Sequence, residues 1–362
     1  MKKELLLAGL CLALLAGCGG DPAASQSQGD GEVSQSAQGS QEQTGTHTIV
    51  DMAGNEVTLP VEINSIVDTW SAATDALFNL GAADKLVSAH SAAVSDVSLL
   101  VYPEMANLED YSKATAEEML KLNPDLVIVS NDDKFQEMQN AGLNAVNLMY
   151  NTYEKFQQST LIMGEILGDE YMERAQAVVD YTDWVTETLA NDLKDVAEED
   201  KPVVYYVMGS SADNLYSTCG GDSIIDEWVT MAGGKLATAQ LGSGMGLKDV
   251  SAEEILATNP DVIMIDGDAA AEVRDAFYNS PEWSGIDAVK NGKIYCIPKG
   301  CFWWGRLCGD TPLQALWAAS ILHPDQVSYD IREETAKYYS EFKQCDLTDE
   351  QLDALLRVDL LP

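Results

Sequence analysis

The sequence predicts an α/β protein of two lobes joined by one long helix. The first observation is a repeat, because the segments that begin at Thr115 and Ser251 share a glutamate pair, a leucine, an Asn-Pro-Asp sequence and a following apolar run. The second is that strand-like and helix-like patterns alternate in two separate blocks, as they do in α/β folds. The third is an apolar stripe between the blocks, with intervals of three or four residues, which is typical of an amphipathic helix.

Each copy of the repeat predicts a capped helix followed by a buried strand. A Ser or Thr with Glu three residues later forms a capping box, in which both side chains bond to free backbone N–H groups. The expected pairs are Thr115 with Glu118 and Ser251 with Glu254. Proline ends the helix because it disfavours helical geometry in the residue before it. The apolar, β-branched run that follows is typical of a buried parallel strand.

The N-terminal segment predicts export and lipid attachment. Residues 1–17 contain two lysines, an apolar run and small residues, which is typical of a signal peptide. The boundary Leu15-Ala16-Gly17-Cys18 resembles the lipobox of bacterial lipoproteins, which implies lipidation of Cys18 and cleavage before it. Ordinary secretion with a chance cysteine is the alternative. Residues 18–45 are rich in Gln, Ser and Gly, and predict a disordered tether.

The remaining chain divides into two lobes and a connector. The expected N-terminal α/β lobe covers 46–165 and opens with a hairpin. A connecting helix is expected over 166–200, and a C-terminal α/β lobe with closing helices over 201–362. Both are Rossmann-like in plan. Since ligands of such sheets bind outside the carboxyl ends of the strands, the sequence predicts a ligand cleft between the lobes.

Charge and hydropathy exclude several classes of partner. The chain carries 59 acidic and 21 basic residues, for a formal net charge of −38, and loss of residues 1–17 makes it one unit more negative. Nucleic-acid phosphates would be repelled by such a surface. No second apolar run reaches transmembrane length. We therefore expect a monomer attached to the membrane by its lipid alone.

The cysteines after Cys18 match no zinc or iron–sulfur spacing. They are Cys219, Cys296, Cys301, Cys308 and Cys345. Two interpretations remain open: a disulfide between Cys301 and Cys308, or buried free thiols. No resident cofactor is expected.

Loops after the predicted strands supply the ligand-binding candidates. The segment 299–306 has the most unusual composition, because three aromatic rings and a guanidinium offer flat faces and a charged donor. Core packing of Trp303 and Trp304, and pairing of Arg306 with Asp310, are the structural alternatives. The full candidate set is Trp70, His90, Asn131, Tyr150, Tyr216, Trp303, Trp304 and Arg306.

Neither a metal site nor a catalytic set is predicted. His90 is nearly alone in the expected cleft, whereas protein metal sites use several His and carboxylate ligands. The sequence contains no Gly-x-Ser-x-Gly and no His-Glu-x-x-His motif. We therefore expect a binding protein and not an enzyme.

Several motifs together resemble the solute-binding lipoproteins of ABC importers for iron-siderophore complexes, haem and cobalamin. These motifs are the hairpin, the two repeat copies, Ala-Gly-Gly-Lys-Leu at 232–236 and Leu-Trp-Ala-Ala-Ser-Ile-Leu-His-Pro at 316–324. The resemblance implies a rigid interlobe helix and delivery of an intact metal chelate to a membrane permease with its ATPase. It also implies that one exposed glutamate in each lobe pairs with permease arginines, and Glu117 and Glu253 match those positions. Compensation of the helix dipole is their alternative role.

The ligand stays open within that family. A ferric siderophore is expected first; haem, with Tyr150, Tyr216 or His90 as axial ligand, and cobalamin are alternatives. Binding of bare zinc or manganese is a further alternative. A rival of another class is an exported enzyme that handles the metal of a tetrapyrrole. The expected location is the outer face of the cytoplasmic membrane.

Overall fold

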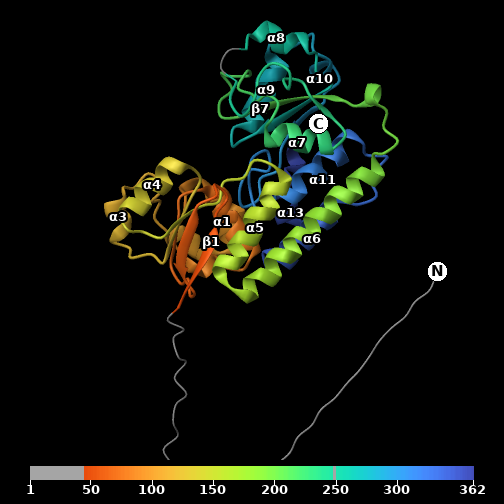
Figure 1. Cartoon of the computed structure of the whole chain (residues 1–362). Helices are drawn as coiled ribbons and strands as arrows, with labels where there is room; N and C mark the ends of the chain where they lie inside the picture. Colours follow the sequence, from red (N-terminus) through yellow and green to blue (C-terminus); the bar gives the residue numbers. More distant parts are fainter. Residues whose placement is uncertain (1–44, 248–249) are drawn as a thin grey trace, which may run out of the picture. The chain divides into compact units, whose positions relative to one another are not determined.

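The computed structural model describes residues 45–247 and 250–362. The signal peptide, Cys18 and nearly all of the tether lie outside these residues. Two four-stranded parallel sheets, one per lobe, confirm the α/β prediction (Figure 1). Their strand orders are β4-β3-β5-β6 and β8-β7-β9-β10, so both lobes have the same topology.

The N-terminal lobe begins with the expected hairpin, in which β1 and β2 pair antiparallel. Its sheet buries the apolar strands on both faces, as a parallel sheet requires. The lobe contains β1 (Thr46–Val50), β2 (Glu56–Pro60), β3 (Ile66–Asp68), α1 (Ser71–Asn79), β4 (Leu86–Ser88), α2 (Asp96–Val101), α3 (Ala116–Leu120), β5 (Leu126–Val129), α4 (Asp132–Asn140) and β6 (Ala145–Asn147). Single 3-10 turns occur at Ala83–Lys85, Ser91–Ala93 and Pro103–Asn107.

The C-terminal lobe repeats this plan around the central strands β7 and β9, which pair over five residues. Its elements are a 3-10 turn at Glu198–Asp200, β7 (Val203–Met208), α7 (Ile224–Met231), β8 (Lys235–Leu236), α8 (Ala252–Ala257), β9 (Val262–Asp266), α9 (Ala270–Asn279), α10 (Asp287–Lys290) and β10 (Ile294–Cys296). The chain ends with α11 (Thr311–Leu322), α12 (Ile331–Phe342), α13 (Asp349–Leu355) and a 3-10 turn at Val358–Leu360.

The two repeat copies are α3 with β5 and α8 with β9. Both helices begin with the predicted capping box, which is confirmed by bonds of 2.8 Å from Thr115 N–H to Glu118 and 2.9 Å from Ser251 N–H to Glu254. Each helix is followed, within three residues, by an asparagine with positive φ, a conformation that asparagine tolerates better than most residues. The aspartate of each copy then accepts a backbone N–H at the start of the central strand of its sheet, from Ser65 or Val203. The repeated sequence therefore builds the same corner in each lobe.

The connector is a helical hairpin whose second member is the long helix. The prediction of one helix over 166–200 is too long at its C-terminal end, because α6 covers Asp169–Asp192. A separate helix, α5 (Tyr153–Leu167), precedes it, and the chain turns at Gly168, whose φ of 107° favours glycine. A Cβ at Gly164 would lie 2.7 Å from Ala175 Cβ, so this glycine allows α5 to approach α6 closely.

The closing helices connect the lobes instead of belonging to the C-terminal lobe alone. α11 contacts both α6 and α7, and it lies between the lobes in Figure 1. One hydrophobic core extends from the N-terminal sheet through α6, α7 and α11 to α12, whereas a second core fills the outer part of the C-terminal lobe. Polar contacts add to this connection, since Asn79 of α1 donates to the carbonyl of Gly309 at 2.8 Å. The first core thus packs against elements of both lobes.

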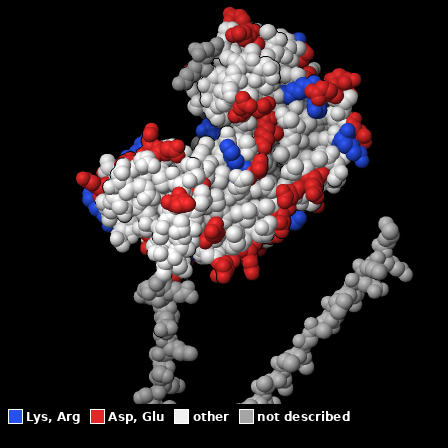
Figure 2. Space-filling view, viewed as in Figure 1, with Lys and Arg blue, Asp and Glu red and all other residues white. Residues whose placement is uncertain are grey.

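Acidic side chains are spread over both lobes and along α6 in the face drawn in Figure 2, in line with the net charge of −38. Among the described residues, no helix is both long and apolar enough to cross a membrane.

Candidate functional site

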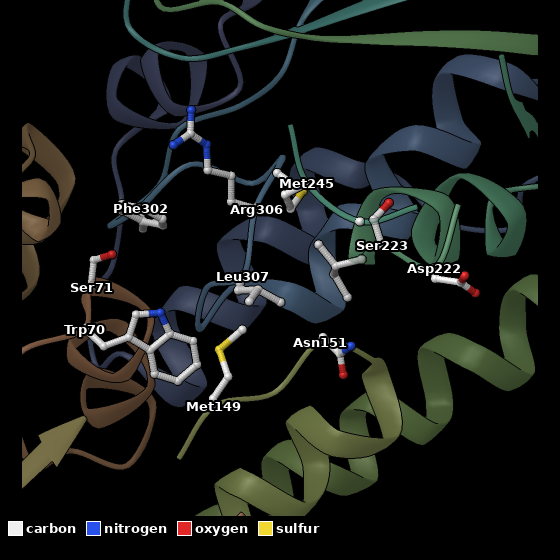
Figure 3. Close-up of a pocket in the computed structure, with 12 residues that line it drawn as sticks. Trp70, Ser71, Met149, Asn151, Asp222, Ser223, Met245, Phe302, Arg306 and Leu307 are labelled. Atoms are coloured by element: carbon white, nitrogen blue, oxygen red, sulfur yellow. The ribbon is translucent and has the colours of Figure 1, made fainter. Parts of the chain in front are cut away.

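A cavity of about 350 Å³ opens between the lobes (Figure 3). The N-terminal lobe supplies its lining from the loops after β3 and β6, and the C-terminal lobe from the start of α7, the loop before α8 and the segment before α11. The lining residues are Trp70, Ser71, Met149, Asn151, Asp222, Ser223, Ile224, Gly244, Met245, Phe302, Arg306 and Leu307. The cavity therefore lies where the sequence predicted a cleft.

Most of the cavity wall is apolar. Trp70 presents an indole that packs edge-on against the buried ring of Tyr150, with ring centroids 5.1 Å apart. Met149 and Met245, from opposite lobes, are 39% and 48% exposed and both line the cavity. Phe302 and Leu307 complete this surface. A ligand with flat or apolar faces would remove this area from water.

Arg306 lines the cavity, but its charge is partly neutralised. Its Nε donates to Oδ2 of Asp266 at 2.8 Å, and Asp266 is fully buried. Burial opposes the charged guanidinium, but the Asp266 carboxylate outweighs this effect and raises the pKa of Arg306. The alternative partner considered from the sequence, Asp310, is instead bonded to Trp304 and Tyr339.

The start of α7 forms the opposite polar wall. Asp222 adopts a φ of 52° and accepts from the hydroxyl of Ser243 at 3.1 Å. Isolated bridges join Cys219 to Met245 and Gly221 to Ser243, so two loops far apart in the sequence meet here. A Cβ at Gly220 would lie 2.1 Å from the carbonyl oxygen of Gly242, which explains the glycines at this contact.

Two of the eight predicted ligand-binding residues, Trp70 and Arg306, line the cavity. Two others are core residues, contrary to expectation. Trp304 is 1% exposed and donates to Asp310 at 2.9 Å, while Tyr150 is 2% exposed and donates to the carbonyl of Cys308 at 3.0 Å. Burial raises the pKa of Tyr150 well above its usual value. An axial-ligand role for Tyr150 does not fit this position.

The other four lie outside the cavity lining. Tyr216 packs on Trp283 and donates to Glu282 at 2.7 Å. Its pKa is raised to about 12, mainly by burial and to a smaller extent by the hydrogen bond to Glu282. His90 accepts from Ala92 N–H through Nδ1 at 3.0 Å. Asn131 caps α4.

Trp303, the last of these four, stacks beneath Arg306, whose guanidinium carbon lies 4.9 Å from the ring centroid. Its ring also packs against Phe302, with ring centroids 4.8 Å apart, so Trp303 contacts two lining residues without lining the cavity itself.

Partial signals in the sequence pointed to the lining residues that were missed. Met149 precedes Tyr150 and follows a buried leucine, so alternation placed it on one face without showing which face was the cleft. Asp222 and Ser223 precede an expected helix, and Met245 lies in a glycine-rich loop whose partner is distant in sequence.

The cysteines of the last predicted loop are buried in the structure. Cys301 and Cys308 carry free thiols, and burial raises the pKa of both well above its usual value. Within residues 45–247 and 250–362, no group of three or more His, Cys, Asp or Glu side chains is arranged to hold a metal ion.

Comparison with known proteins agrees with this architecture. Residues 66–300 match the family model described as periplasmic binding protein. The molybdate-binding protein MolA of Haemophilus influenzae is 24% identical over 331 residues, which cover 81% of this chain and 90% of MolA. The iron(3+)-hydroxamate-binding protein YxeB of Bacillus subtilis is 22% identical, over 82% of this chain and 89% of YxeB. A solved periplasmic solute-binding protein of Veillonella parvula superposes with a TM-score of 0.76 at 25% identity, covering 87% of this chain and 98% of that one.

Proposed function

The chain belongs to the periplasmic binding protein family, and we propose that it is the lipid-anchored binding protein of an ABC importer for an iron chelate. The observation that carries the proposal is the cavity, whose wall is contributed by both lobes and is mostly apolar and aromatic. Such a wall suits the outer surface of an organic chelate that is released unchanged to a permease.

The charge of the cavity favours a ferric siderophore of low net charge. Arg306 is paired with Asp266, and Asp222 adds a second carboxylate. A strongly anionic chelate would meet little free positive charge here. A ferric trihydroxamate fits better, because its three hydroxamate charges balance Fe³⁺. The similarity to YxeB, whose name specifies an iron(3+)-hydroxamate, supports the same class.

Tryptophan fluorescence tests the ligand class. Purified protein is titrated with a ferric trihydroxamate, a ferric catecholate, haemin, cobalamin and molybdate. We expect saturable one-to-one quenching by the trihydroxamate, which Trp70→Phe removes. Trp184→Phe is the matched control, since Trp184 lies on α6 beside Tyr181 and outside the cavity lining.

Three outcomes contradict the proposal. A response to haemin or cobalamin alone would transfer the function to the tetrapyrrole alternatives, and a response to molybdate alone to an oxyanion. Recovery of a chemically altered chelate would indicate an enzyme.

Docking to the permease is proposed to use Glu117 and Glu253. Both are exposed on the first turns of α3 and α8, at the outer ends of the two lobes (Figure 1). Within the described part of the chain, neither carboxylate forms a salt bridge. Their neighbours Glu118 and Glu254 are engaged in the capping boxes. The free acids would therefore be available to arginines of a permease.

Two matched double variants distinguish docking through Glu117 and Glu253 from a general effect of negative charge on these helices. Glu117→Gln with Glu253→Gln should retain chelate affinity and abolish uptake by cells. Glu118→Gln with Glu254→Gln removes the same charge from the same helices, while glutamine preserves a capping box, and should retain uptake. Equal uptake by the two double variants would refute the docking assignment.

Attachment through Cys18 is part of the proposal and concerns a residue outside the described ones. Cys18→Ser should release the protein from the membrane fraction into the medium or periplasm. Its retention in that fraction would contradict a lipid anchor at this residue.

A further inference from the structure

We propose that Ser71 and the first-turn N–H groups of α1 form the subsite for an anionic, hydrogen-bond-accepting oxygen of the ligand. This inference rests on the proposed function and specifies how the cavity orients what it binds. The acceptor chemistry is shared by a hydroxamate or carboxylate of a chelate and by a free oxyanion.

The N-terminus of α1 lacks the cap that most helices of this chain have. The cap position is occupied by Trp70, whose side chain makes no capping bond, and the first turn contains no acidic residue. The N–H groups of Ala73 and Thr74 bond to the carbonyl of Trp70. No described residue accepts from the N–H of Ser71 or Ala72. A helix start carries partial positive charge, so these groups attract an anionic oxygen.

Ser71 is the independent observation that points to a ligand. The residue is only 7% exposed, and its hydroxyl has no hydrogen-bond partner among residues 45–247 and 250–362. It lines the cavity, and Figure 3 shows its oxygen directed into the group of lining residues, on the side of Phe302. The hydroxyl oxygen itself is not among the enclosed side-chain atoms of the described residues that lack a partner, so it is reached from the cavity. Its partner therefore comes from the contents of the cavity, water or a ligand.

The other two helices that begin at the cavity are closed. Ser223 of α7 accepts from Asp226 N–H at 3.2 Å and donates to the Gly220 carbonyl at 2.8 Å. At α5, Thr152 caps the helix, and Glu227 from the opposite lobe accepts from Tyr153 N–H at 3.0 Å. α7 also carries acidic residues in its first turn. At α1 the Asp68 carboxylate accepts from Trp70 N–H and from the Thr74 hydroxyl, but no described residue accepts from the N–H groups of Ser71 and Ala72. Among these three helices, α1 is therefore the one whose first-turn N–H groups are left without a side-chain cap.

Arg306 does not replace this subsite. Its Nε is bonded to Asp266, which directs the guanidinium toward the C-terminal sheet. The carboxylate of Asp222 lines the α7 side of the cavity. The ligand is thus oriented with its acceptor oxygen at α1 and its least negative part at Asp222.

Two substitutions at Ser71 test the subsite with a ferric trihydroxamate and, separately, with molybdate alone. Ser71→Ala should weaken binding about tenfold, the worth of one hydrogen bond to a charged acceptor. Ser71→Asp should weaken binding more than a hundredfold, because its carboxylate occupies and neutralises the helix start. The same Asp should raise the melting temperature slightly, since acids stabilise first turns. A purely structural serine would not move affinity and stability in opposite directions.

Thr348→Ala is the control, because Thr348 caps α13 away from the cavity. It should lower the melting temperature and leave affinity unchanged. Loss of molybdate binding in Ser71→Asp would assign the subsite to a free oxyanion, and loss of trihydroxamate binding to an oxygen of the chelate. Ser71 variants that bind within twofold of the wild type would overturn this inference alone. A wild type that binds neither probe would overturn the proposed function as well.

Discussion

The first helix of each lobe follows the first strand of a sheet with the same strand order, yet the two helices begin in opposite ways. Two residues separate α1 from β3, Trp70 occupies the cap position without a side-chain bond, and no described residue accepts from the N–H groups of Ser71 and Ala72. α7 starts after a long loop and is closed by Ser223 and first-turn acids. A shared topology therefore fixes where a helix starts and leaves the chemistry of its start to the local sequence.

The two helices also differ in the charged groups that contact them. Asp75 of α1 contacts Lys343, which is completely buried and lies 3.1 Å from Asp310. α7 is held instead by apolar side chains such as Trp228, which is 1% exposed, and by contact with α11. Both helices are therefore packed into the first core, and α1 has in addition a buried ion cluster.

Breaking the ion cluster should have the largest effect on stability. Burial opposes the charge of Lys343, but Asp310 and Asp75 outweigh it and raise its pKa well above the usual value. Lys343→Met would leave two buried carboxylates without a cation, and we expect a loss of about 3–5 kcal/mol. Urea unfolding measures this loss.

A double variant tests whether unpaired carboxylates cause this loss of stability. Lys343→Met with Asp75→Asn removes one of the two charges, while the Asn oxygen still accepts from Gly309 N–H, and should recover part of the stability. A single Lys343→Met variant as stable as the wild type would show that the cluster does not hold α1.

The first strand of each parallel sheet ends at a different kind of side chain, and only one of the two can titrate. β3 ends at Asp68, which is completely buried, whereas β7 ends at Met208. Burial raises the pKa of Asp68 to about 7, although the hydrogen bonds that Thr74 and Trp70 donate to its carboxylate lower the pKa. Burial likewise raises the pKa of Asp75 to about 6.

These shifts give the stability a defined pH dependence. A carboxyl whose pKa is higher in the folded than in the unfolded protein stabilises the fold at low pH, and that contribution disappears as pH rises through the folded pKa. Stability should therefore fall from pH 4 to pH 7, by at most about 1.4 kcal/mol per pH unit for each proton.

Asp68→Asn should flatten this decline from about pH 5 to pH 7, and little decline should remain between pH 6 and 7, where Asp75 becomes mostly ionised. General charge repulsion affects wild type and variant alike, so the difference between their urea-unfolding curves isolates Asp68. Parallel pH profiles for the two proteins would contradict the assignment.

Sequence reasoning succeeded where the determining contacts are local. The capping boxes and the Asn-Pro stops involve residues three or four apart, and both copies form as predicted. Trp70 was found because it directly follows a strand. Tyr150 and Trp304 were misplaced because alternation separates two faces of the chain without identifying which one faces the cleft. Asp222 and Met245 were missed because their meeting depends on bridges between distant loops.

The smallest expected effect concerns the two serines at the helix starts. Ser223→Ala removes a cap whose hydroxyl both accepts and donates, and should cost about 1 kcal/mol of the free energy of unfolding. Ser71→Ala removes a hydroxyl with no described partner, so the unliganded protein should lose clearly less. Urea unfolding of both variants without ligand measures the difference. Equal losses would mean that the Ser71 hydroxyl is already satisfied within the folded chain, and the open start of α1 would then be no different from the closed start of α7.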